Sequence, residues 1–117
     1  MIVINKFIPA KGFIAMAIFP FIFVRKDLAH KFTDVSKNHE LIHFQQQKEL
    51  FVIGFYILYI VEFIVRIIGF WVKGKLANTD TAYRNISFEK EAYSNQENME
   101  YLTTRKRFNF KNYLKEV

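Results

Sequence analysis

The apolar run LFVIGFYILYIVEFIVRIIGFWVK, residues 50–73, constrains the fold of this chain more than any other segment. Its length and composition predict an apolar helix that crosses a bilayer or lies against one. Glu62 and Arg66 divide the run, and a charge at mid-bilayer costs about 2.5 to 3.5 kcal/mol on insertion scales. Their spacing of four residues favours a helical ion pair, which offsets part of that cost. A helix is therefore predicted over 50–73. The helix either crosses the bilayer or lies against it, and the sequence leaves both placements open.

The chain has 117 residues, which is the size of one domain with a single hydrophobic core. We therefore expect one domain over residues 1–117. The net charge of +6 suits an anionic membrane surface or nucleic acid, but the aromatics of the basic tail follow no nucleic-acid recognition motif. A membrane surface is thus the expected partner, and nucleic acid is not. Because cysteine is absent, a metal site would have to use histidine and carboxylate ligands.

Residues 13–24 are uncharged and rich in Phe and Ile, with Pro20 inside the segment. A helix of this length would cover about 18 Å, which is too short to cross a bilayer. Proline cannot donate to a sheet ladder, so Pro20 favours a turn or an edge position between two short strands. The run is followed by charged residues and carries no small-residue cleavage pattern, so a removable signal peptide is not expected.

The rest of the chain is predicted to be mainly helical. From Asp34, a suitable N-cap, apolar and polar residues alternate with helical spacing through Leu50. Turn-forming residues over 74–86 predict a loop, and residues 87–107 predict another helix that begins at Ser87. One face of this helix would consist of Phe88, Ala92, Met99 and Leu102. The expected fold class is mainly α with a short N-terminal β-hairpin.

The stretch HELIH, residues 39–43, is an H-E-x-x-H motif on the first of these helices. Histidines four residues apart lie on one helical face, where both can bind a single Zn²⁺. Glu40 would then lie beside the metal and could accept the proton of a bound water. The alternative is that His39 and His43 are ordinary, partly buried polar residues.

A catalytic zinc site needs a third protein ligand, and the only other histidine is His30, so a carboxylate has to supply it. The segment FEKEAYSN, residues 88–95, is the obvious source. With HELIH, it resembles the H-E-x-x-H zinc metallopeptidases of the gluzincin type, which include membrane-embedded members such as the CAAX prenyl proteases. In that family the third ligand opens an E-x-x-A-D or E-x-x-x-D stretch on a second helix.

The resemblance implies a zincin-like helix packed against a glutamate-bearing helix, and it fits this chain in two registers. In the first, Glu89 is the third ligand and Tyr93 stands where the family has aspartate. In the second, Glu91 is the ligand and Asn95 takes the place of that aspartate, as the partner of a histidine ligand. Residues two apart on a helix point in opposite directions, so only one glutamate can face the metal. Glu89 is the preferred ligand and Glu91 the alternate, although acids in the first turn also stabilise a helix without any function.

Two further side chains are candidates for the site. Gln46 lies one turn beyond His43, where it would bind substrate or orient a ligand, unless it belongs to a solvated face. Tyr83 precedes the glutamate-bearing segment and would polarise a substrate carbonyl.

A zinc site shared by the two helices conflicts with a simple membrane span. If residues 50–73 crossed the membrane, the histidines and Glu89 would lie on opposite sides, and lipid does not tolerate a polar loop returning through the hydrocarbon. We therefore expect the helix to break near Gly54, because glycine is the weakest helix former in that region. The second segment would then fold back beside the first as a compact or membrane-surface unit.

The sequence predicts a small zinc metallopeptidase-like hydrolase that acts on a peptide or protein substrate by a metal-activated water. It is expected to be associated with a membrane at the cytoplasmic face, with a soluble cytoplasmic location as the alternative. The alternative function is a non-catalytic, membrane-associated interaction protein, with or without bound zinc. In that case the apolar helix and the basic aromatic tail would supply the function.

Overall fold

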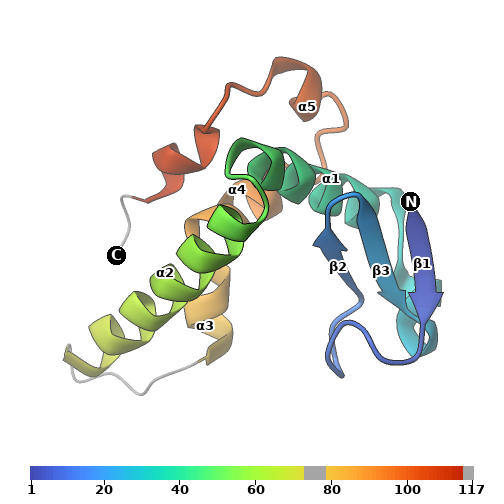
Figure 1. Ribbon diagram of the computed structural model, residues 1–117, viewed down its shortest axis with the longest axis horizontal. Coiled ribbons are helices and arrows are strands. Elements are labelled where there is room, and N and C mark those ends of the chain that lie inside the picture. Colours follow the sequence, from blue (N-terminus) through green and yellow to red (C-terminus); the bar gives the residue numbers. More distant parts are fainter. Residues whose placement is uncertain (73–78, 115–117) are drawn as a thin grey trace.

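The computed structural model describes residues 1–72 and 79–114 and is mainly helical, as expected (Figure 1). A small sheet at the N-terminus is followed by helices that occupy the rest of the described chain. The strands are β1 Ile2–Asn5, β2 Ala15–Ile18 and β3 Phe21–Arg25. The α-helices are α1 Asp34–Glu49, α2 Ile53–Val72, α3 Thr79–Arg84, α4 Ser87–Asn95 and α5 Tyr101–Thr104. Two 3₁₀-helices span Lys26–Lys31 and Asn109–Tyr113.

The sheet has the strand order β1-β3-β2. Strands β2 and β3 form the expected antiparallel hairpin around Pro20, whereas β1 pairs with β3 in parallel and was not predicted. Strand β1 is short and half exposed, so its sequence has little of the alternating pattern that marks a strand. Ile22 and Val24 of β3 are buried and share a core cluster with Phe44 of α1. This packing places the edge strand β2 next to the helix that carries the histidines.

The N-cap of helix α1 lies one residue earlier in the chain than predicted. Thr33, not Asp34, is the N-cap, and Asp34 is the first helical residue. The Thr33 hydroxyl accepts a hydrogen bond from the Ser36 backbone N–H, and the Ser36 hydroxyl accepts one from the Thr33 N–H. This reciprocal capping box satisfies two of the backbone donors that a helix start leaves unpaired. The prediction of Asp34 was wrong because N-cap preference alone ranks Asp above Thr, whereas Thr33 gains the reciprocal bonds with Ser36.

The chain reverses direction between α1 and α2, as the topological argument requires, but the reversal does not occur at Gly54. It occurs at residues 50–52, where Phe51 and Val52 have φ values of 59° and 62°. The Val52 N–H closes the turn by donating to the Gln47 carbonyl at 2.7 Å. Gly54 lies in the first turn of α2 instead. A left-handed conformation is unfavourable for a β-branched residue such as Val52, so local propensity points to the wrong residue.

Helix α2 packs one face against the rest of the protein. Phe55 is 2% exposed and lies in a core cluster with Ile86, Phe88 and Phe110. On the same side, Glu62 accepts hydrogen bonds from the backbone N–H and the hydroxyl of Ser87. Glu62 therefore satisfies a donor at the start of α4 in addition to pairing with Arg66.

The segment after α2 differs from the prediction in two respects. Residues 74–86 were expected to be a loop; within the described part of this segment, α3 is helical, and residues 74–78 lie outside the described residues. The single helix expected over 87–107 is two helices, α4 and α5, separated by a turn that exposes Met99. Asn38 of α1 fixes this turn, because its side-chain amide donates to the backbone carbonyls of Gln96 and Asn98. Ser87 is the first residue of α4, and its N-cap is Ile86.

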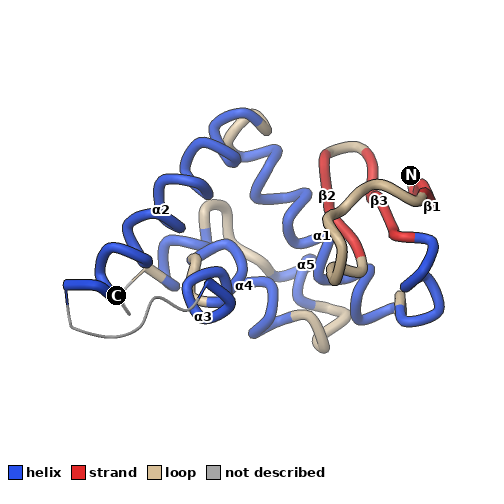
Figure 2. Tube along the Cα trace, turned by 90° about the horizontal axis from the view of Figure 1, so that it is seen from below, coloured by secondary structure: helices blue, strands red, loops and turns tan. Residues whose placement is uncertain are grey.

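Helix α4 returns along α1, so the glutamate-bearing segment lies beside the HELIH helix (Figures 1 and 2). Ala92 of α4 is fully buried against Ile42 of α1 and Tyr101 of α5. A small side chain at this position lets the two helices approach closely. Residues 50 apart in sequence thus come within hydrogen-bond distance at the centre of the molecule.

Candidate metal centre

The centre of the molecule brings together the side chains of His39, His43 and Glu89. The His39 Nε2 atom lies 3.1 Å from Glu89 Oε1, and the His43 Nε2 atom lies 3.2 Å from Glu89 Oε2. The two Nε2 atoms are 3.2 Å apart. All three side chains are buried, and one donor atom from each can be chosen so that all lie within 4.8 Å of one another. Both histidines therefore present the same ring nitrogen to the same carboxylate.

This geometry matches the donor set of a zinc site. Zinc bound to histidine and carboxylate has bond lengths of about 2.0 to 2.2 Å in a tetrahedral arrangement, which puts neighbouring ligand atoms roughly 3.3 Å apart. The separations between the donors of His39, His43 and Glu89 are close to that value. Two imidazoles and one carboxylate also make up the ligand class of catalytic zinc sites, which leave a fourth position for water. The residues present therefore fit a zinc ion.

A glutamine holds the far nitrogen of each histidine. The Nδ1 atom of His43 lies 2.7 Å from the Gln46 side-chain oxygen, and the Nδ1 atom of His39 lies 2.9 Å from that of Gln96. Each oxygen can accept the Nδ1 proton, which fixes the tautomer so that Nε2 is free to bind a metal. Gln46 thus contacts His43, and it would orient that histidine if a metal were bound there. Gln96 was not predicted, because it lies outside both motifs and reaches His39 only through the turn after α4.

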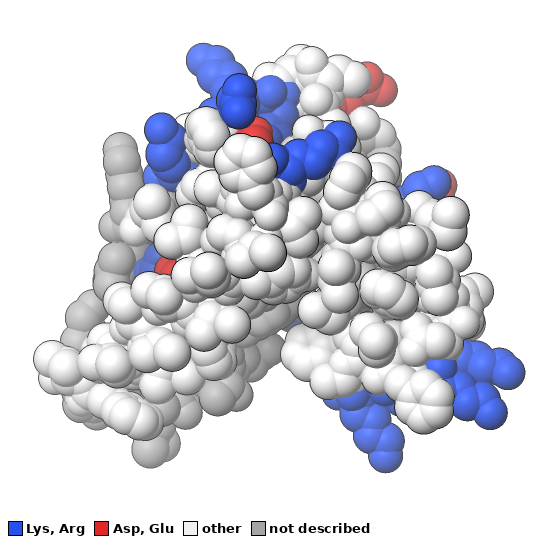
Figure 3. Space-filling model, in the orientation of Figure 1, with Lys and Arg blue, Asp and Glu red and all other residues white. Residues whose placement is uncertain are grey.

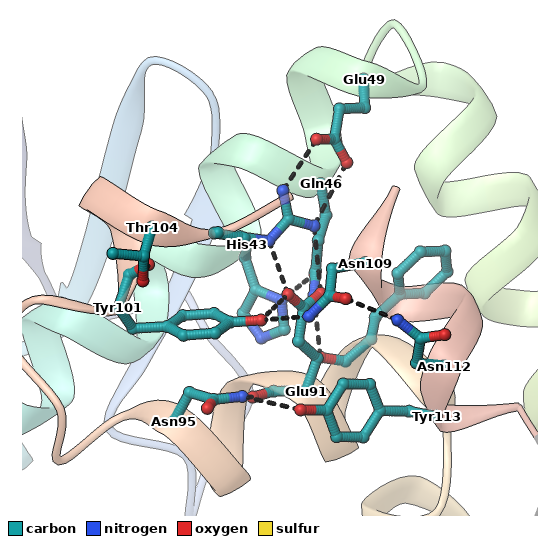
Figure 4. A network of polar contacts seen from close by, with 12 residues as sticks. His43, Gln46, Glu49, Glu91, Asn95, Tyr101, Thr104, Asn109, Asn112 and Tyr113 are labelled. Carbon is teal, nitrogen blue, oxygen red and sulfur yellow. Dashed lines mark hydrogen bonds and ion pairs between the residues drawn. The ribbon is translucent and has the colours of Figure 1, made fainter. Parts of the chain in front are cut away.

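Glu91 lies in a buried polar network that reaches His43 through Gln46 (Figure 4). Its carboxylate accepts hydrogen bonds from the Arg105 guanidinium, the Tyr101 hydroxyl and the Gln46 amide. Burial alone would raise the pKa of Glu91, but these donors hold that pKa below its usual range. Arg105 also pairs with Glu49 at 2.7 Å. Glu91 is therefore two contacts removed from His43, and it supports the glutamine that orients that histidine.

Asn95 does not contact either histidine. Its side-chain amide donates to the Glu91 backbone carbonyl and to the Tyr113 hydroxyl (Figure 4). The second register of the resemblance, with Glu91 as ligand and Asn95 as the partner of a histidine, is thus not the arrangement in the structure. His30 is exposed on the first 3₁₀-helix and takes no part in the cluster.

Glu40 lies beside the cluster and lines two cavities. One, of about 340 Å³, is mostly apolar and is bounded by Phe13, Met16, His43, Phe55, Tyr59 and Glu89 among others. The second, of about 500 Å³, includes His39, Arg84, Tyr93 and Gln96. Both cavities share Phe13, Ala15, Glu40 and Tyr83. The two cavities therefore meet at Glu40, the carboxylate of the HELIH motif.

Burial raises the pKa of Glu40, and the nearby histidines only partly oppose this effect. The backbone N–H of Ala17 on β2 also acts on the Glu40 carboxylate through a hydrogen bond. A buried carboxylate with a raised pKa is closer to the range in which it can both accept and donate a proton near neutral pH. Strand β2 thus positions the group that the motif assigns to proton transfer.

Two tyrosines complete the surroundings of the cluster. The Tyr59 hydroxyl of α2 donates to Glu89 Oε2 at 2.6 Å, the same oxygen that lies 3.2 Å from His43 Nε2, and this bond helps to orient the carboxylate. Tyr83 of α3 lies where the two cavities meet, close to Glu40 and Glu89. Tyr59 was not predicted, because an aromatic residue in an apolar helix carries no signal that separates a ligand partner from a core residue.

The charges of the metal-free cluster depend on one another. Burial by itself would lower the pKa of His43, but the adjacent Glu89 carboxylate outweighs burial and raises that pKa to about 9. Burial would raise the pKa of Glu89, and the two histidines instead hold it far below its usual value. Without a metal, the cluster is therefore an imidazolium–carboxylate pair at neutral pH.

We expect zinc binding at pH 7 to release about one proton per chain. His43 carries that proton in the metal-free protein because its pKa is about 9, whereas a histidine ligand must be neutral. As the pH falls below 9, protons compete with zinc for His43, and the zinc affinity declines by about tenfold per pH unit. Titration calorimetry in buffers of different ionisation enthalpy measures the released proton. Equal apparent enthalpies in all buffers would contradict the expected charge of His43.

Comparison of the chain with protein-family models, with curated proteins and with solved structures finds no match.

Proposed function

We propose that this protein is a small zinc-dependent peptide hydrolase associated with a membrane. In this proposal the HELIH helix α1 packs against the glutamate-bearing helix α4 in a zincin-like manner. His39, His43 and Glu89 are the metal ligands. The single observation that carries the proposal is the meeting of these three donors at ligand spacing, with Glu40 beside them in a cleft.

The chemistry of this site would be hydrolytic. A zinc ion bound there would polarise a carbonyl and lower the pKa of a bound water. Glu40 accepts a proton from the attacking water and passes it to the leaving amine, a role that its position beside the cluster and on the walls of both cavities favours. Tyr83 lies in the cleft beside Glu40, where its hydroxyl would donate to the carbonyl oxygen as negative charge develops.

The shape of the cleft supports an extended polypeptide as substrate. The two cavities meet at Glu40, so a chain passing through both would place a peptide bond beside that carboxylate. Ala15 of the edge strand β2 lines both cavities, and edge strands bind extended peptides through main-chain hydrogen bonds. The apolar lining of the first cavity suits an apolar side chain next to the cleaved bond.

The alternative function, a non-catalytic interaction protein at a membrane, draws on the exposed surface of α2. This helix is long enough and apolar enough to cross a membrane, judged by length and composition. The two functions share the membrane and differ in whether the buried cluster binds metal and turns over a substrate. Zinc content after purification without added metal separates them, since the proposed hydrolase should hold about one zinc per chain.

We expect Glu40→Gln to retain zinc and to lose hydrolysis by a factor of about 10² to 10⁴, the usual contribution of a general base. The amide keeps the shape of the side chain but cannot accept a proton. The measurement is zinc content and cleavage of a mixed peptide library by the two proteins, followed by mass spectrometry.

Glu97→Gln is the matched control, because Glu97 is exposed and lies outside the site. That variant should cleave the library at the wild-type rate. If Glu40→Gln also cleaves at that rate, Glu40 has no role in the reaction. If the zinc-loaded wild-type protein cleaves no peptide, the hydrolase proposal is lost in favour of the interaction protein.

A further inference from the structure

The outward side of α2 is a continuous apolar surface. Every exposed residue of this helix is apolar, and contiguous patches of this extent are rare on soluble monomers. The surface, called the apolar face below, consists of Ile53, Ile57, Leu58, Ile60, Val61, Ile64, Val65, Ile68, Trp71 and Val72. These residues are between 44% and 81% exposed. They recur at helical spacing, so they form one stripe along the helix.

The two charged residues of α2 do not interrupt the apolar face. Arg66 is only 4% exposed, and the Glu62 side chain is 14% exposed and accepts hydrogen bonds from Ser87. Glu62 contacts the start of α4, and Arg66 pairs with Glu62 on the same helix. The charges that divide the apolar run in the sequence are therefore absent from its outer surface.

A group of cations lies near the N-terminal end of α2. Lys48 and Arg107 line the same surface hollow, and Arg107 and Lys111 both lie over the Phe108 ring. All three cations are exposed, and they are called the basic cluster below. Figure 3 shows Lys and Arg at the edges of a broad uncharged surface that extends over α2 and the strands. Cations beside an apolar surface complement the negative headgroups of a membrane.

We propose that the apolar face and the basic cluster bind the surface of an anionic phospholipid membrane, with α2 lying in the plane of the interface. This inference rests on the membrane association in the proposed function, and it adds the lipid class and the orientation. A helix with one apolar side and cations beside it inserts that side at the boundary between headgroups and acyl chains. Trp71 at the other end of the stripe suits the same depth, since tryptophan favours the interface.

The packing of α3 and α4 favours this orientation over a span. Both helices lie on the inner side of α2, and α3 carries the exposed Arg84. A spanning α2 would bring these helices, the Glu62–Arg66 pair and the histidine cluster to the depth of the hydrocarbon. Charged groups are costly there. With α2 in the interface, they all lie on the aqueous side.

The orientation also places the cleft at the membrane surface. Phe55, Tyr56 and Tyr59 of α2 form one wall of the first cavity. The helix that lies on the lipid is thus the helix that lines the cleft. Polypeptide segments next to a membrane anchor are therefore the substrates that this orientation presents to Glu40.

The first test is flotation of the full chain with vesicles, carried out on both the zinc-loaded and the zinc-free protein. We expect binding to vesicles of phosphatidylcholine mixed with phosphatidylglycerol, and binding at least tenfold weaker to phosphatidylcholine alone. Combined Lys48→Gln, Arg107→Gln and Lys111→Gln should remove most of this preference for anionic lipid. Ile64→Asp should weaken binding by about tenfold or more, whereas Met99→Asp, at an exposed apolar residue outside the apolar face, should not.

The second test measures depth with a single tryptophan. Trp71 is the only tryptophan of the chain, so Trp71→Phe with Ile60→Trp moves the probe to the middle of α2. We expect the strongest quenching from lipids brominated near the headgroup end of the acyl chain. Quenching that is strongest at the chain ends would show a span and overturn the interfacial orientation.

Two other results would overturn the proposal. The first is a folded wild-type protein that binds neither kind of vesicle. The second is a stable dimer in sedimentation experiments that is disrupted by Ile64→Asp and does not bind vesicles, because the apolar face would then serve a second copy. Circular dichroism verifies that each variant is folded. Vesicle binding is measured independently of zinc and of cleavage, so its failure is distinguishable from failure of the proposed hydrolase.

Discussion

Replacing His43 with alanine is expected to abolish measurable zinc binding. The substitution leaves Glu89 and His39 as the only two ligands, whereas a catalytic zinc site needs three from the protein. The loss should exceed the 10- to 100-fold change that is typical when a residue supporting a ligand is removed. His39→Ala should have the same effect for the same reason. Zinc content and competition with a fluorescent chelator measure it.

The third histidine offers a matched control for this prediction. His30 is exposed on a 3₁₀-helix away from the cluster, so His30→Ala should leave zinc affinity unchanged. Equal zinc affinity in wild type, His43→Ala and His30→Ala would show that the cluster is a structural ion pair and not a metal site.

Alanine substitutions of the two glutamates of α4 are expected to have opposite effects on zinc binding and stability. Glu89→Ala should remove zinc binding, whereas Glu91→Ala should largely retain it and destabilise the fold. Glu91 is fully buried and pairs with Arg105, whose guanidinium remains charged at any accessible pH. Breaking a buried ion pair on one side costs about 3 to 5 kcal/mol. Removing Glu89 costs less, because His43 can lose its proton when the carboxylate is gone.

Urea unfolding of the metal-free proteins, together with zinc titration, tests both halves of this contrast. Each variant serves as the control for the other, since the two residues share a helix and a side-chain type. A larger zinc effect from Glu91→Ala would return the ligand role to that residue. An unfolding free energy of Glu91→Ala equal to that of the wild type would show that the Glu91–Arg105 pair contributes little to stability.

The elements of the fold that the sequence predicts are those whose structure is determined by their own residues. The HELIH helix, the apolar helix and the N-terminal hairpin each carry their own periodic pattern or turn residue. The reversal between α1 and α2 was inferred from a distance constraint, but its location was not, since Phe51 and Val52 lack the usual signal for left-handed backbone. Strand β1 depends on a parallel partner twenty residues away in register, from Ile2 to Ile22, which no local pattern reveals.

In the candidate site, too, the residues with a local sequence motif were predicted and those without one were not. The spacing of HELIH places His39 and His43 together, and the E-x-x-A pattern points to Glu89 on the side of the small Ala92. The partners that orient the ligands, Gln96 and Tyr59, come from other elements and carry no motif. Arg105 explains why Glu91 turns away from the histidines, yet it lies fourteen residues beyond that glutamate in a tail that the sequence describes only as basic.

The glutamines behind the two histidines bear on the total charge of a loaded site. Gln46 and Gln96 carry no charge, whereas an aspartate in either place would add a negative charge. A zinc ion with the Glu89 and Glu40 carboxylates then sums to zero. A neutral assembly is less costly to hold in a medium of low dielectric constant than a charged one. The amide pair would thus allow a divalent cation to be held within a small core, where a more acidic surrounding would need further cations to balance it.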